Sequence, residues 1–196
     1  MENTLLRFIG NAAAFVFAAV LMEFIARWMH KYVMHRYGWC LHYDHHNYTG
    51  RVFQKNDLYA LFFAVLSFVL IYFGLKNQMS VMASAGFGVA LYGVGYVLFH
   101  EIIYHHRIKW LKIKPKNVYL RRIINAHRVH HAAATKGGAV NFSFLWAPKK
   151  YAPGNEEEIR KQMAEIHAMQ LALRRREKER EEEREQVKRG RSNEDS

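Results

Sequence analysis

Cysteine is nearly absent from this chain, and acidic residues are scarce outside its C-terminal end. The single cysteine, Cys40, excludes an internal disulfide and cannot supply the thiolates of a structural zinc site. Residues 155–196 hold 11 Lys and Arg against 12 Asp and Glu, which leaves 18 basic but only five acidic residues in 1–154. A basic body beside long apolar runs favours contact with an anionic membrane surface. No recognised nucleic-acid-binding motif is present, so we expect no nucleic acid partner.

Three apolar segments are long enough to cross a lipid bilayer, which takes about 20 residues per helix. They are residues 5–25, 58–75 and 79–99, and the last two carry no charged side chain. The first lacks a strongly basic start, so we expect a retained span and not a cleaved signal peptide. The third is rich in Gly, Ala and Ser, which permits close helix packing in a membrane. A core helix of a water-soluble protein is the alternative for this third segment.

The connections between these segments indicate the topology. Only residues 76–78 separate the second span from the third, so these two spans form a hairpin. Residues 28–57 and 100–196 then lie on the same side of the membrane. Their excess of Lys and Arg predicts that this side is cytoplasmic. We therefore expect a multi-pass membrane protein whose C-terminus faces the cytoplasm.

The C-terminal part differs in composition from the rest of the chain. Asn155 and the three glutamates after it indicate a helix start, because carboxylates are favoured at the positive end of the helix dipole. We expect a helix over 155–190. Beyond Leu173 it has no apolar face, so we interpret it as a solvated helix, frayed or disordered at its end. The chain is thus divided into a membrane-embedded unit, 1–154, and a charged tail, 155–196.

Ten of the twelve histidines follow a repeated pattern, H-x4-H and then H-x2-H-H. The first copy reads HKYVMH and HYDHH, and the second reads HEIIYH and HRVHH. The ten are His30, His35, His42, His45, His46, His100, His105, His127, His130 and His131. We interpret this gathering at the ends of the spans as metal binding. His106 could replace His105 as a ligand, but the repeated spacing favours His105, and we expect the isolated His167 to be structural.

Helix geometry limits how these histidines can share metal ions. At about 100° per residue, the three histidines of H-x2-H-H project within about 100° of one another. The two of H-x4-H lie about 140° apart and would approach a site from opposite flanks. Two adjacent ions suit both spacings better than one ion does.

The ligand type narrows the choice of metal. Imidazole binds Zn, Cu, Fe and Ni, and about five nitrogen ligands on each ion leave one position of an octahedral iron open for O2. We therefore expect two Fe ions, with O2 as co-substrate, and zinc as a substitute in purified protein. The predicted fold is all-α: an integral membrane helical bundle of about three to four transmembrane helices, with a cytoplasmic histidine-rich di-metal cap and a charged C-terminal helical tail.

Several stretches of the sequence resemble a known family: MHKYVMHRYGWCLHYDHH, FQKNDLYALFF, YGVGYVLFHEIIYHHR, AHRVHHA and FSFLWAPKKY. They resemble the membrane histidine-rich di-iron hydroxylases and desaturases of the fatty acid hydroxylase superfamily and, more narrowly over residues 24–152, the bacterial β-carotene hydroxylases. The resemblance implies a di-iron, O2-dependent monooxygenase of carotenoid biosynthesis. It would insert an O2-derived hydroxyl group at C3 of β-ionone rings, converting β-carotene through β-cryptoxanthin to zeaxanthin.

The resemblance also implies partners and a location. The ten histidines would be the metal ligands, with no further catalytic residue. The lipid-soluble carotenoid would enter from the membrane, which for this family is the bacterial inner membrane. Electrons would come from a ferredoxin-type or other reductase that docks on the basic cytoplasmic surface.

Other residues near the motifs have expected supporting roles or depart from the family pattern. Asn56 and Asp57, at the start of the second span, could orient ligand imidazoles by hydrogen bonds or could cap that helix. His106 is a third candidate for such support. The family leads us to expect an acid where Gln54 stands, and a more glycine-rich segment where 136–144 stand. We expect neither of these departures to touch a ligand.

Other functions fit parts of the pattern. The nearest is a hydroxylase or desaturase of another lipid, a fatty acyl chain, a sterol or a keto-carotenoid, because all of these are apolar. A non-catalytic membrane metal carrier would place its ligands near the middle of the bilayer, whereas every motif histidine lies at or beyond the end of a predicted span. A b-type cytochrome would hold its haem with histidines inside the spans.

Overall fold

The computed structural model describes residues 2–47, 51, 53–108, 110–111 and 113–194, and every element in them is helical. The α-helices are α1 (Glu2–Met29), α2 (Trp39–His46), α3 (Asp57–Lys76), α4 (Ser80–Gly95), α5 (Val118–His131) and α6 (Glu156–Glu194). Two π-helices, η1 (His30–Tyr37) and η2 (Tyr96–Tyr104), continue α1 and α4, and η3 (Lys149–Tyr151) is a short 3-10 helix. The predicted all-α fold is confirmed for the described residues.

Three helical segments are long and apolar enough to cross a membrane: Asn3–Tyr37, Asp57–Lys76 and Ser80–Tyr104. Their outward faces are apolar, and Phe8, Phe17 and Phe68 are each about two-thirds exposed. Exposed apolar surface on this scale is unfavourable in water and is satisfied by lipid. The segments contain the first two predicted spans and all but residue 79 of the third, and they support a membrane bundle.

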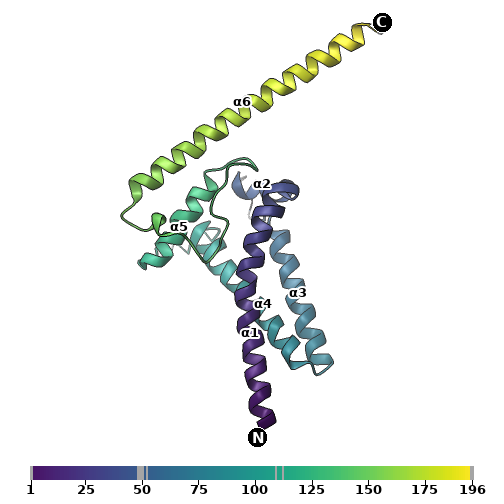
Figure 1. The fold of residues 1–196 in the computed structure, drawn as a ribbon, viewed down its shortest axis with the longest axis vertical. Coiled ribbons are helices and arrows are strands. Elements are labelled where there is room, and N and C mark those ends of the chain that lie inside the picture. Colours follow the sequence, from purple (N-terminus) through teal and green to yellow (C-terminus); the bar gives the residue numbers. More distant parts are fainter. Residues whose placement is uncertain (1, 48–50, 52, 109, 112, 195–196) are drawn as a thin grey trace.

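Helix α4 is the centre of the bundle, because α1 and α3 both pack against it. Small residues let the backbones approach closely. A Cβ atom at Gly74 would lie 2.5 Å from the Ala83 nitrogen, and one at Gly88 would lie 2.3 Å from the Phe15 carbonyl oxygen. The α3–α4 hairpin turns near the same end of the bundle as the N-terminus, and α2 and α5 lie at the opposite end (Figure 1). The two histidine-bearing regions therefore meet at one end, as the hairpin predicts.

The tail begins against this end of the bundle and then leaves it. Ile159 and Ile166 of α6 pack on Ile123, Ala126 and other residues of α5 in one buried apolar cluster. Beyond residue 173 the described side chains of α6 are exposed, and the helix extends away from the bundle (Figure 1). The predicted solvated helix is confirmed, and it continues to Glu194. The division at residue 154 stays a prediction, since the first turns of α6 pack on α5.

Candidate metal centre

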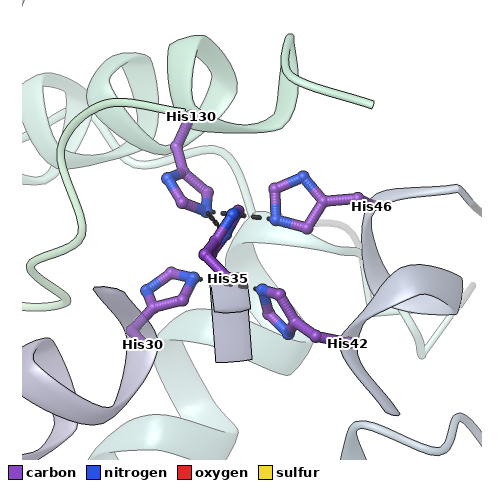
Figure 2. A group of neighbouring side chains, drawn as sticks. All are labelled: His30, His35, His42, His46 and His130. Atoms are coloured by element: carbon purple, nitrogen blue, oxygen red, sulfur yellow. Dashed lines mark hydrogen bonds between the residues drawn. The ribbon is translucent and has the colours of Figure 1, made fainter. Parts of the chain in front are cut away.

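Nine of the ten motif histidines form two adjacent groups in which ring nitrogens face one another. Metal group 1 contains His30, His35, His42, His46 and His130 (Figure 2). Metal group 2 contains His45, His100, His105 and His127. Within each group, one ring nitrogen of every member lies within 4.8 Å of those of the others. Each group thus has the donor type and the spacing that hold a transition metal. That these histidines are ligands stays a prediction.

The two copies of the histidine pattern exchange one member each. The middle histidine of HYDHH, His45, joins metal group 2, and the middle histidine of HRVHH, His130, joins metal group 1. Neither copy of the pattern forms a group alone. The short helix α2 and the end of α5 must therefore pack together before either group is complete.

His131 belongs to neither group but lies beside both. Its ring stacks on His46 at 4.3 Å between centroids and lies 4.4 Å from the ring of His127. Its Nε2 atom is buried and has no hydrogen-bond partner among the described residues. Under the exchange of middle histidines, His131 corresponds to His46, so its expected place is metal group 2. A lone pair that is buried without a partner fits a metal ligand.

The H-x4-H pairs sit on the two π-helices, and this corrects an expectation from the sequence. The expected offset of 140° assumes α-helical geometry. His105 follows η2 directly, and its nitrogen donates to the His100 carbonyl oxygen at 3.0 Å, an i→i+5 bond that places these two residues one turn apart on the same face. His30 and His35 in η1 have ring centroids 5.2 Å apart and share metal group 1. The approach from opposite flanks is therefore wrong.

Most imidazoles of metal group 1 are held by backbone carbonyl groups. The Nδ1 atoms of His30, His46 and His130 lie 2.8–3.0 Å from the carbonyl oxygens of Phe142, Ala133 and Val140. His35 Nδ1 lies 3.4 Å from that of Lys136. A carbonyl oxygen only accepts, so each Nδ1 carries the proton and each Nε2 presents a lone pair. The expectation that 136–144 touch no ligand is wrong, since three of these carbonyls belong to that segment.

The Nε2 atoms point at one another over short distances. The Nε2 atoms of His30 and His42 are 3.2 Å apart, and the Nε2 of His130 lies 3.2 Å from that of His35 and 3.1 Å from that of His46. With every proton on Nδ1, these contacts would bring lone pairs together with no hydrogen between them. A cation between the rings removes this repulsion. The residues present therefore fit a bound metal ion.

The imidazoles outside the membrane spans are held in the neutral form that binds metal. Burial, with the neighbouring imidazoles, lowers the pKa of His46 to about 2 and that of His105 to about 3. Burial also lowers the pKa of five further motif histidines well below the usual value: His42, His45, His127, His130 and His131. A neutral ring has the lone pair that a metal needs, and no proton must first be displaced near pH 7.

Side-chain oxygen atoms support three further rings, those of His42, His45 and His100. His42 Nδ1 donates to Asn56 Oδ1 at 2.6 Å, and His45 Nδ1 donates to Gln54 Oε1 at 3.1 Å. His100 Nδ1 donates to Glu101 Oε1 at 2.7 Å. The contact from Gln54 corrects the expectation that this residue touches no ligand. Glu101 was not singled out in the sequence, although its position directly after a motif histidine in a membrane span was a signal.

Arg107 connects several of these supporting residues. Its guanidinium group contacts the carboxylates of Asp57 at 2.9 Å and Glu101 at 2.5 Å, and donates to Gln54 Oε1 at 2.7 Å. Asp57 therefore contacts Arg107, which in turn contacts Gln54 and Glu101. In the described hydrogen bonds, Asp57 itself contacts no imidazole. His106 is exposed, lies outside both groups and has a positive φ of 49°. The orienting roles expected for Asp57 and His106 stay predictions, without a direct contact to a ligand.

An apolar cavity lies between the membrane spans and borders the region of the metal groups. It has a volume of about 770 Å³ and is lined by side chains of α1, η1, α3, α4 and η2. A second cavity of about 60 Å³ is lined by His30 and His42 of metal group 1 and by His45, His100 and His127 of metal group 2. Both cavities share the lining residues Ala26, Met34, Tyr92 and Tyr96. An apolar molecule in the larger cavity would have one end beside both groups.

Comparison with known proteins gives a consistent family. The family model described as fatty acid hydroxylase matches residues 15–148. A β-carotene hydroxylase of Pantoea ananas is 44% identical over 137 residues, which cover 69% of this chain and 77% of that protein. One of Pseudescherichia vulneris is 36% identical over 141 residues, 71% of this chain and 78% of that protein. β-Carotene 3-hydroxylase 2 of Arabidopsis thaliana chloroplasts is 34% identical over 168 residues, 83% of this chain and 54% of that protein. No solved structure matches the chain.

Proposed function

Because this chain belongs to the fatty acid hydroxylase family, we propose that it is a β-carotene 3-hydroxylase, a monooxygenase that inserts an O2-derived hydroxyl group at C3 of β-ionone rings. The observation that carries the proposal is the apolar cavity between the spans, which shares four lining residues with the smaller cavity beside both metal groups. The family match over residues 15–148 contains all four histidine motifs, and the bacterial relatives are named as β-carotene hydroxylases.

The ligand set supports iron. All ten candidate ligands are imidazoles, and Cys40 is exposed, so no thiolate is available to make a structural zinc site. Two iron ions would supply activation of O2 for attack on a C–H bond, which no side chain in the cavity can perform. The C3 hydrogen of a β-ionone ring is not acidic, so general base catalysis would not remove it. Zinc would compete for the same imidazoles during purification.

The cavity walls bind and orient the substrate. Leu61, Phe68 and Val97 line the larger cavity and are each about half exposed or more, so the cavity is open at the lipid-facing surface of the bundle. A carotenoid can therefore enter sideways from the membrane without crossing water. The polyene would lie among these apolar side chains, while the ring would reach the smaller cavity beside Tyr96 and the histidines. The apolar lining also keeps bulk water away from the reacting ring.

The charge distribution supports an orientation and a partner. Lys114, Lys116, Arg121 and Arg128 are exposed near the histidine end of the bundle. By the positive-inside tendency we propose that this end faces the cytoplasm. The bacterial relatives lead us to propose the bacterial inner membrane. An acidic, ferredoxin-type or other reductase would dock on this basic surface and deliver electrons to the nearby metal groups.

The proposal is tested by expressing the full chain in cells that accumulate β-carotene. We expect β-cryptoxanthin and zeaxanthin to appear in pigment extracts, with oxygen from labelled O2 in the hydroxyl groups. The control is His45→Ala, which removes a member of metal group 2 and should leave β-carotene unchanged. Unchanged pigment with iron-loaded protein of the native sequence would overturn the proposal. In that case the products would be sought among fatty acyl, sterol and keto-carotenoid substrates.

A metal carrier is the candidate of another class. Uptake of iron into sealed proteoliposomes, abolished by His45→Ala, would favour it. The structure gives it little support, because both groups lie at one end of the bundle and the larger cavity between the spans is apolar. A transported ion needs polar groups along its route through the membrane.

A further inference from the structure

We propose that the two metal groups are inequivalent, and that Glu101 is the positioning residue that makes metal group 2 the tighter site. The inference rests on the proposed function in one respect, that both groups hold a metal ion. It concerns how this chain distributes affinity between the two ions, and it does not depend on which lipid is oxidised.

The first observation is a difference in the acceptors behind the imidazoles. In metal group 1, four Nδ1 atoms face backbone carbonyl oxygens and His42 faces the amide of Asn56, so every acceptor is neutral. In metal group 2, His100 donates to the carboxylate of Glu101 at 2.7 Å. A carboxylate behind a ligand imidazole raises the basicity of the other nitrogen, and losing such a partner typically costs about 10–100-fold in metal affinity.

The second observation is that Glu101 is alone in this contact. Among the residues that the structure describes, it is the one carboxylate hydrogen-bonded to a motif histidine. Glu23 accepts from Tyr92 and from the Phe144 and Leu145 nitrogens, and Asp44 accepts from the Lys55 nitrogen. Asp57 faces Arg107. Negative charge therefore reaches the imidazoles at one point, on metal group 2.

The third observation is that Glu101 is held in this orientation on two sides. Glu101 is 8% exposed, with Nε of Arg107 at 2.5 Å from Oε2. Its other oxygen, Oε1, faces His100 Nδ1 at 2.7 Å. Arg107 is fixed in turn by Asp57 and by Gln54, whose amide oxygen supports His45 of the same group. The network thus fixes the rings of His45 and His100 together.

The experiment measures binding of Fe²⁺ to the metal-free full chain in detergent, without oxygen, by equilibrium dialysis with iron analysis. For the native sequence we expect two binding events with clearly separated dissociation constants. Glu101→Gln keeps the size and the hydrogen-bond acceptor but removes the charge, so we expect the tighter event to weaken by about 10–100-fold while the weaker event is unchanged. Asp44→Asn is the matched control, because it removes a carboxylate from the same end of the bundle that contacts no histidine.

A further variant assigns the events to the groups. His35→Ala removes a member of metal group 1 alone and should delete the weaker event. If Glu101→Gln fails to fold, Asn56→Asp tests the same idea from the other side, since it places a carboxylate behind His42. We expect that variant to tighten the weaker event by a similar factor.

Several outcomes would overturn the inference. One class of equal sites in the native chain would do so, as would weakening of both events by Glu101→Gln or an equal effect of Asp44→Asn. The proposed function fails in a different way. Two separated binding events in a protein that leaves β-carotene unchanged would overturn the hydroxylase proposal and would support the inequivalence of the groups.

Discussion

A neutral imidazole has one N–H group and one lone pair, so the partner of the N–H group decides where the lone pair points. In seven of the ten motif histidines, Nδ1 donates to an oxygen atom, which leaves Nε2 for metal. The spacing of the motifs was enough to single out all ten candidates. Of the supporting residues, the sequence singled out Asn56, which accepts from His42, but not the others, because four of the seven oxygens belong to backbone carbonyls and any residue type can supply one. Gln54 and Glu101 needed the tertiary contacts as well.

His131 provides a test at this scale, because it is the one motif histidine outside the two groups. Its buried Nε2 without a partner predicts a ligand role. We expect His131→Ala to abolish hydroxylation and to lower the iron content from about two ions per chain to about one. His106→Ala and His167→Ala are the controls, since both side chains are exposed, and both variants should keep activity and iron. Full activity of His131→Ala, or loss of activity in His106→Ala, would contradict the assignment.

The lowered pKa values predict how the metal-free protein responds to acid. Burial lowers the pKa of His46 to about 2 and that of His105 to about 3, from a usual value near 6.5. As the pH falls below about 6.5, the unfolded chain binds protons at these positions and the folded chain does not, so the free energy of unfolding decreases. Above pH 6.5 this contribution is fully present. We expect the thermal midpoint of the metal-free protein in detergent to be lower at pH 5 than at pH 8.

The acid effect has a matched control in His167→Ala, which removes an exposed histidine and should leave the pH dependence as it is. Iron binding should strengthen the effect, because protons and the metal ion compete for the same lone pairs. A thermal midpoint that is equal or higher at pH 5 would contradict the buried, neutral state of these rings.

At the scale of helices, the spans could be predicted closely and the π-helices could not. The apolar lengths of 58–75 and 79–99 correspond to α3 and to α4 with η2. The switch to π geometry after Met29 and after Gly95 has no signature in composition. The H-x4-H spacing itself was the usable signal, because two histidines five residues apart reach one ion most easily when the helix makes i→i+5 bonds. The assumption of 100° per residue, which holds for an α-helix, led to a different prediction from the same spacing.

Helix α4 offers a matched pair of glycines that tests the cavity as the substrate site. Gly93 lines the larger cavity, Gly95 does not line it, and a Cβ atom at either position would meet nothing within 4 Å. Replacing either with Leu also removes the helix penalty of glycine, about 1 kcal/mol. We expect both variants to fold and to bind two iron ions. Gly93→Leu should lose tenfold or more in β-carotene turnover, whereas Gly95→Leu should stay within about twofold of the native chain.

Pigment analysis in carotenoid-producing cells, normalised to the iron-loaded protein recovered from membranes, measures this difference. Equal turnover in the two glycine variants would show that the carotenoid does not occupy the space beside Gly93. Loss of iron in Gly93→Leu would show that the substitution disturbs the metal groups. That result would contradict the prediction that both variants bind two iron ions.

At the scale of the whole molecule, one short connection determines how the two histidine regions meet. The residues between Lys76 and Ser80 reverse the chain, so α3 and α4 are antiparallel. This brings α5 to the end of the bundle where α2 lies (Figure 1). This juxtaposition was predictable, because it needs only the lengths of the spans and of the loop. The exchange of His45 and His130 between the groups was not predictable, since it depends on the packing of α2 beside α5 at side-chain detail. The contact between α6 and the segment that supports metal group 1 could not be predicted from the sequence either.

The first half of α6 braces the segment that supports metal group 1. Gln170 is 3% exposed, and its Nε2 donates to the Gly137 carbonyl oxygen at 2.8 Å. The neighbouring Gly138 has a positive φ of 81°, and a Cβ atom there would lie 2.8 Å from the Gln170 amide. The same segment continues to the carbonyl groups that accept from His130 and His30. The tail therefore has a structural part up to about residue 173 and a projecting part beyond it.

Two substitutions and one shortened chain separate these parts. Gln170→Ala removes the brace and should destabilise the folded state by about 1 kcal/mol, with faster loss of iron to a chelator, because the segment that orients His30 and His130 is loosened. Gln186→Ala is its matched control, since that side chain is exposed on the projecting part of α6. A chain that ends at Leu173 should keep the thermal midpoint, two iron ions and carotenoid turnover of the full chain. Iron loss from the shortened chain at the rate of Gln170→Ala would mean that the projecting part also stabilises the metal centre, against the exposure of its side chains.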